Sequence, residues 1–198
     1  LAWEAQRPAA QRVFDWRVIR HKSPPYPNLG RRKLVRKFLE RCPEAEVLVM
    51  VDDDAGFEPW QLGALAEQVS AARPVVQGLY FSYDGGQGGV QRIVLQREAD
   101  GSLDTIWRYE PGTLQEVDAI GTHCVAIRRS ALEAWQAGHG DTWFDFGTRA
   151  NGDFALEDEA FSVRMQELGH KLYVHTGIHV QHWKLGPKGQ QDYVVGNK

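Results

Sequence analysis

The sequence has few cysteines, little net charge and no long apolar run, and each absence argues against a class of protein. Only two cysteines occur in 198 residues, Cys42 and Cys124, far apart and without the pairing typical of metal sites. A disulfide framework is therefore not expected, and the sequence favours a location in the reducing cytoplasm. No apolar run approaches the roughly 18 residues that span a bilayer, and no signal peptide is recognisable. The formal net charge of -3 gives no signature of nucleic-acid binding.

The remaining composition is that of an ordinary globular domain, with 42% apolar and 25% charged residues. The length predicts one domain over residues 1–198, with a polar tail from about 186. Strand-like and helix-like apolar patterns alternate, which favours an α/β fold with a mainly parallel sheet. The expected strands are 14–19, 47–51, 75–83, one within 117–128, 171–175 and 178–182; the expected helices are 31–41, one from 59, 130–138 and one from 157 to 169; a hairpin is expected across 91–96 and 105–109.

The most informative segment is an apolar strand, 47–51, that ends in three adjacent carboxylates, Asp52, Asp53 and Asp54. In open α/β sheets, ligands bind beyond the carboxyl ends of strands. Three neighbouring acids repel one another unless a cation compensates, and carboxylate oxygens suit Mg²⁺ or Mn²⁺. The alternative is a turn in which Asp side chains bond to nearby backbone N–H groups.

Two other acidic or nucleotide-binding motifs do not fit. A calcium loop of the EF-hand type needs D-x-D/N-x-D/N-G, and the Ala-Gly after Asp54 breaks that pattern. A P-loop enzyme needs G-x-x-x-x-G-K-S/T, which occurs nowhere in the chain.

A second acidic group, Glu157, Asp158 and Glu159, opens a helix. Acids in a first turn interact favourably with the helix dipole, so capping is the alternative to a catalytic role. The basic cluster Arg31, Arg32, Lys33, Arg36 and Lys37 could meet phosphate, or it could be a solvated helix face.

Histidines gather near the C-terminal end, at positions 170, 175, 179 and 182. Side chains alternate between the two faces of a strand, so His182 should point inward together with Ile178 and Val180. His179 should point the other way. An inward histidine is either a hydrogen-bonded core residue or, near a carboxylate cluster, a metal ligand.

Taken together and in their order along the chain, several segments resemble the GT-A class of nucleotide-sugar glycosyltransferases, especially its small bacterial and phage-type members. Residues 52–54 resemble the D-x-D motif of that class, and 30–35 its Arg-rich helix start. Residues 76–81 resemble the strand that follows, and 117–122 with 128–130 the acceptor-side strand and helix. Glu157-Asp158 is similar to the E-D pair, and 180–182 to the late V-x-H. The likeness covers residues 30–185.

The resemblance implies a GT-A (Rossmann-like), mostly parallel sheet with a small antiparallel hairpin. It also implies transfer of a sugar from a nucleoside-diphosphate sugar, UDP- or GDP-linked, to a saccharide or other hydroxyl acceptor. The implied residues are Asp52, Asp54 and His182 for Mn²⁺ or Mg²⁺; Asp52, Asp53, Arg31 and Arg32 for the donor; and Asp158 and Glu157 for catalysis. In an inverting reaction Asp158 would take the acceptor proton, and its place at a helix N-terminus should keep it ionised but weakly basic.

The sequence departs from the family pattern at two points. The family's first strand is missing or only partly represented before residue 14, and His123 stands where members often have a second glycine. Two other functions stay open: a metal-dependent nucleotidyltransferase and a non-catalytic carbohydrate-binding relative. The first would usually show a Gly-rich basic loop near the N-terminus.

Overall fold

The computed structural model describes residues 17–19, 26–84, 89–92, 95–99, 101–106, 108–149, 152–183 and 187–188. Its elements, in chain order, are α1 (Pro27–Arg41), β1 (Val47–Val51), β2 (Ala55–Gly56), α2 (Pro59–Gln68), β3 (Val75–Leu79), β4 (Phe81–Asp84), β5 (Gly89–Arg92), β6 (Leu95–Arg97), β7 (Leu103–Thr105), β8 (Leu114–Val117), β9 (Cys124–Arg128), α3 (Arg129–His139), β10 (Gly147–Thr148), β11 (Phe154–Ala155), α4 (Glu157–Glu167), β12 (Leu172–His179), β13 (Gln181–Trp183) and β14 (Pro187–Lys188).

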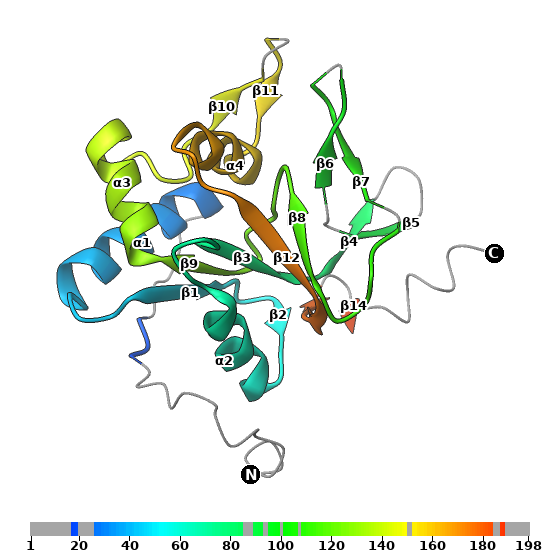
Figure 1. Ribbon diagram of the computed structural model, residues 1–198, viewed down its shortest axis with the longest axis horizontal. Coiled ribbons are helices and arrows are strands. Elements are labelled where there is room, and N and C mark those ends of the chain that lie inside the picture. The colour runs from blue at the N-terminus through cyan, green and yellow to red at the C-terminus, as the bar shows by residue number, and fades with distance from the viewer. Residues whose placement is uncertain are drawn as a thin grey trace.

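Five strands form the central sheet, in the order β1-β9-β3-β12-β8 (Figure 1). Only β3 and β12 pair in parallel, and the other three neighbouring pairs are antiparallel. The α/β class is therefore confirmed, whereas the expectation of a mostly parallel central sheet is wrong.

The connections explain this difference. A parallel neighbour requires a crossover of a dozen or more residues, usually a helix. Between β3 and β8 the described residues form the short pairs β4–β5 and β6–β7 and no helix. β9 then begins seven residues after β8 ends, and it enters the sheet in the opposite direction to β1 and β3. Apolar runs report burial on both faces of a strand and say nothing about its direction.

Helices cover both faces of the sheet, with α1, α3 and α4 on one side and α2 on the other (Figure 1). Side chains alternate along β1. Leu48 and Met50 therefore lie in the core on the side of α1, α3 and α4, whereas Val49 packs in the core on the side of α2. On the larger side the Phe161 ring stacks between Trp135 and Phe144, with ring centroids 5.5 and 4.5 Å away. These buried layers make the sheet a rigid support for the residues at its edges.

Most expected helices form, with shifted ends. α1 begins at Pro27, four residues early, because proline is well accepted in a first helical turn. α3 begins at Arg129 without a side-chain cap from Ser130, and it ends next to Gly140, whose φ is 65°, and not at Gly138. α4 closes before Gly169, at φ 79°, as expected.

The strand predictions are met in part. β12 continues through Gly177, so the two strands expected at 171–175 and 178–182 are largely one strand followed by β13. The hairpin expected across 91–96 and 105–109 forms with shifted bounds, as β6 pairs antiparallel with β7 and Gly101 lies in the turn between them. Residues 17–19 are not in a strand, and residues 14–16 and most of the expected tail lie outside the described residues. None of the helices in the described part of the chain is long and apolar enough to cross a membrane.

Candidate active site

Three segments that are distant in sequence meet where β1 ends. The antiparallel register pairs Val51 with Cys124, so the residues that flank this pair, Asp52 and His123, are also neighbours. The backbone N–H of Asp52 donates to the carbonyl of His123 at 2.9 Å. Three residues after Asp52, at Ala55, β2 pairs with β13, which sets His182 opposite Ala55 and therefore beside Asp54.

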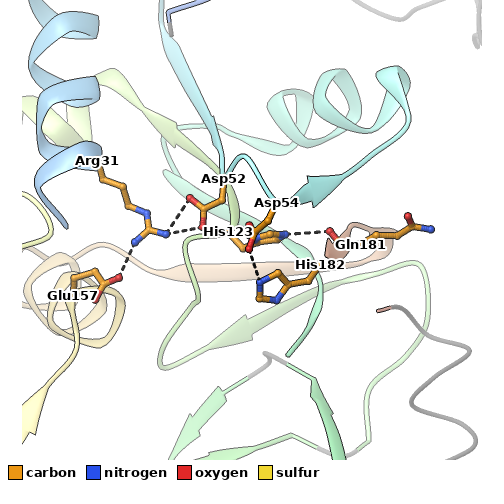
Figure 2. A network of polar contacts seen from close by, with 7 residues as sticks. All are labelled: Arg31, Asp52, Asp54, His123, Glu157, Gln181 and His182. Atoms are coloured by element: carbon orange, nitrogen blue, oxygen red, sulfur yellow. Dashed lines mark hydrogen bonds and ion pairs between the residues drawn. The ribbon is translucent and has the colours of Figure 1, made fainter. Parts of the chain in front are cut away.

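The side chains of Asp54, His123 and His182 converge at this point (Figure 2). His182 Nε2 lies 3.1 Å from Asp54 Oδ2, and His123 Nδ1 lies 3.4 Å from Asp54 Oδ1. One donor atom from each residue lies within 4.8 Å of the other two. Both imidazoles are buried, while the Asp54 side chain is 37% exposed. The cluster is therefore open to solvent on its carboxylate side.

This cluster fits a divalent cation. Protein ligands at about 2.0–2.3 Å from one ion lie about 3–4 Å from each other, and the separations of the two imidazole nitrogens from the Asp54 oxygens, 3.1 and 3.4 Å, fall in that range. Imidazole nitrogen and carboxylate oxygen are both common metal ligands. The pair Asp54 and His182 was selected from the sequence, and its members meet here. The inward direction expected for His182 is confirmed, since it is buried together with Ile178 and Val180.

Beside the cluster, Arg31 links two of the predicted site residues (Figure 2). Its Nη2 donates to both carboxylate oxygens of Asp52, at 2.7 and 3.1 Å, and its Nη1 donates to Glu157 Oε1 at 2.8 Å. The Arg31 side chain is only 10% exposed. It therefore ties the beginning of α1 to the end of β1 and the beginning of α4.

Asp52 lies beside the cluster and not within it. Burial alone would raise the pKa of Asp52, but contacts with His123 and the charge of Arg31 outweigh burial and lower it. Asp52 is therefore held ionised, with Oδ2 3.5 Å from His123 Nδ1. Asp53, the middle acid of the three, is exposed. Metal ligation by Asp52 and donor binding by Asp52 and Asp53 stay predictions.

The two arginines expected to bind the donor are both held by carboxylates. Arg32 Nη1 donates to both oxygens of Asp145, at 2.8 and 3.1 Å, and Arg36 forms a more exposed ion pair with Asp141. The basic cluster is therefore not a simple solvated helix face, because three of its five members pair with acids from other elements. A direct contact of Arg31 or Arg32 with a donor stays a prediction.

Asp158, the predicted base, has a raised pKa. Burial is the main cause and the charge of Glu157 the second, and together they exceed the effects of the Glu159 N–H bond and of Arg31. The expectation that the helix N-terminus would weaken its basicity is therefore wrong, because desolvation is the larger effect. Tyr80 is near both groups of acids: burial and then the charge of Asp158 raise its pKa, and its ring centroid lies 4.8 Å from that of His123.

Sequence reasoning missed His123 as a member of the cluster. Its side chain is 3% exposed, and Nε2 lies 3.1 Å from the backbone carbonyl of Gln181 (Figure 2). Its position next to the beginning of an apolar strand could have attracted notice only if that strand had been known to run antiparallel to β1.

The chain has no match among family models or curated proteins. Among solved structures it is similar to A197 from STIV, with a TM-score of 0.48 and 18% identity, over 81% of this chain and 69% of that one.

Proposed function

We propose that this protein is a metal-dependent glycosyltransferase that transfers a sugar from a nucleoside-diphosphate sugar to a hydroxyl acceptor. The proposal rests mainly on one observation: Asp54 and His182, chosen from the D-x-D and V-x-H segments, lie 3.1 Å apart although 128 positions separate them in sequence. A chance likeness of short motifs would not require their side chains to meet. The second carboxylate of the D-x-D segment, Asp52, is beside them and is held ionised.

The residues fit the demands of diphosphate departure. Asp54 and His182 would hold Mn²⁺ or Mg²⁺, and a bound divalent cation neutralises the charge that grows on a leaving diphosphate. The partly exposed carboxylate of Asp54 marks the side from which the donor would approach. Arg31 fixes Asp52 and Glu157, so the acidic groups are already oriented before a ligand binds.

Asp158 is the candidate base for an inverting reaction. A base must be ionised at working pH yet basic enough to accept a proton. The raised pKa of Asp158 makes it more basic than an ordinary carboxylate, and the group is ionised at a pH above that pKa. Glu157 contributes through its charge, which helps to raise the pKa of Asp158, and through its bond to Arg31. A retaining reaction would not need this base, and Asp158 would then orient the acceptor or stabilise the donor sugar.

The experiment is a thermal-shift screen of UDP-, GDP-, CMP- and dTDP-sugars, with Mn²⁺ and with EDTA. A donor at 100 times its Kd stabilises a protein by about 2.7 kcal/mol. For a chain of this size that is a rise in Tm of roughly 5–10 °C. We expect one donor class to give such a rise only with Mn²⁺, and release of the nucleoside diphosphate should then be measurable in the presence of a suitable acceptor.

Asp54→Asn and Asp141→Asn form a matched pair for this screen. Asp54→Asn should abolish the metal-dependent shift. Asp141→Asn alters an exposed ion pair with Arg36 and a hydrogen bond from Gln136, both outside the cluster, and should preserve the shift. A shift with nucleoside triphosphates and none with nucleotide sugars would contradict the proposal and favour a nucleotidyltransferase.

A further inference from the structure

We infer that His123 is a third protein ligand of the cation, and that the site accordingly prefers a transition metal such as Mn²⁺, Co²⁺ or Zn²⁺ to Mg²⁺. The link to a donor diphosphate rests on the proposed function. The ligand set itself follows from the geometry around one imidazole ring.

The first step is the protonation of His123 Nε2. This nitrogen lies 3.1 Å from the Gln181 carbonyl oxygen, which can only accept a hydrogen bond. Nε2 must therefore donate its N–H. In a neutral imidazole the other nitrogen, Nδ1, then carries a lone pair and no hydrogen. A backbone carbonyl that fixes the far nitrogen in this way is the usual companion of a metal-ligating histidine.

The second step is the surroundings of Nδ1. It lies 3.4 Å from Asp54 Oδ1 and 3.5 Å from Asp52 Oδ2, in a side chain that is 3% exposed. Two carboxylate oxygens thus converge on this buried ring nitrogen, and a positive charge placed among them is favourable. A divalent cation bound by His123, Asp54 and His182 supplies that charge and uses all three donor atoms.

The third step is rigidity. The carbonyl of His123 accepts from the backbone N–H of Asp52. The His123 ring packs against those of Tyr80 and His182, with centroids 4.8 and 4.3 Å away. Backbone pairing therefore places His123 and Asp52, and ring packing orients the imidazole. The ligand set is thus largely formed before any ion arrives, which lowers the ordering cost of binding.

The donor set decides the metal preference. Two imidazole nitrogens and one carboxylate oxygen suit transition metals, whereas Mg²⁺ favours carboxylate, carbonyl and water oxygens. Among divalent ions, affinity for such a site should rise from Mn²⁺ to Co²⁺, and Mg²⁺ should bind most weakly. Three ligands leave further positions for diphosphate oxygens and water.

The test uses the whole chain, freed of metal by EDTA, with no donor present. Calorimetric titration with Mn²⁺, Co²⁺ and Mg²⁺ gives the order of affinities. Electron spin-echo spectroscopy of bound Mn²⁺ counts the coordinated imidazole nitrogens. We expect two imidazoles in the unmodified protein and one in His123→Ala, with Co²⁺ affinity lower by about 10²-fold or more, since loss of even an outer-shell partner costs about 10–100-fold.

His139→Ala is the matched control, because His139 is exposed on α3 and outside the cluster. It should leave both measurements unchanged. If Nδ1 instead carries a second proton and only pairs with the carboxylates, one imidazole will be counted in the unmodified protein and His123→Ala will leave Co²⁺ affinity unchanged. That result would overturn the inference. So would failure to bind Mn²⁺ or Co²⁺, or a higher affinity for Mg²⁺ than for either ion. The metal titration uses no donor, so it is independent of the thermal-shift screen with nucleotide sugars. If the metal binds as inferred but no nucleotide sugar raises Tm, the proposed transferase function is refuted and the ligand set stands.

Discussion

Replacement of Arg31 by methionine tests whether the ionic bridge beside the cluster is as strong as its burial implies. Arg31→Met keeps much of the aliphatic stem but removes the charge that faces Asp52 and Glu157. The three side chains are 10%, 35% and 16% exposed. Breaking a buried ion pair costs about 3–5 kcal/mol because an uncompensated charge stays behind.

The partial exposure of Asp52 lowers that figure, since water screens its charge. We therefore expect Arg31→Met to lower the free energy of unfolding by about 3 kcal/mol. For a chain of 198 residues this corresponds to a fall in Tm of about 6–12 °C. Urea unfolding followed by circular dichroism measures the free energy, and a thermal scan measures Tm.

Arg36→Met is the control, because Arg36 and its partner Asp141 are 46% and 37% exposed. This exposed pair should contribute less than about 1 kcal/mol. Adding Glu157→Gln to Arg31→Met should recover part of the lost stability, because the double variant no longer buries an unpaired Glu157 charge. Equal and small losses in Arg31→Met and Arg36→Met, with no recovery in the double variant, would refute the reasoning.

Two further predictions concern the roles of single side chains. Asp158→Asn should lower turnover by roughly 10²–10⁴-fold with donor affinity nearly intact, and loss of donor binding would instead assign Asp158 to the donor pocket. Because the folded-state pKa of Asp158 is raised, its favourable contribution is complete below the unfolded-state pKa and is lost as pH rises through the folded-state pKa. Asp158→Asn should therefore raise Tm at neutral pH, and the difference from the unmodified protein should shrink in acid. His182→Ala should weaken Mn²⁺-dependent binding of nucleoside diphosphate, measured by calorimetry with an EDTA reference. The ring of His179 contacts the Thr176 carbonyl, and His179→Ala should leave this binding nearly unchanged. Equal effects of the two substitutions would contradict the assignment of His182 as a metal ligand.

Local patterns in the sequence determined the parts of this protein that depend on near neighbours. The apolar run 47–51 predicted β1 in full, because a strand buried between two layers of helices needs apolar side chains on both faces. The alternation 178, 180, 182 predicted that His182 points inward, because successive strand residues face opposite sides. The acids at 52–54 pointed to the end of β1 as a candidate site, and which side chains would join them was not evident from the sequence.

Only the tertiary structure decided which distant side chains meet those acids. Apolar periodicity carries no information about strand direction, so a mainly parallel sheet was expected, and in such a sheet the beginning of β9 would lie at the edge opposite to the end of β1. In the antiparallel register Val51 pairs with Cys124, and His123 therefore lies beside Asp52. The pKa of Asp158 was likewise set by burial, which depends on every layer packed around α4 and not on the helix terminus alone.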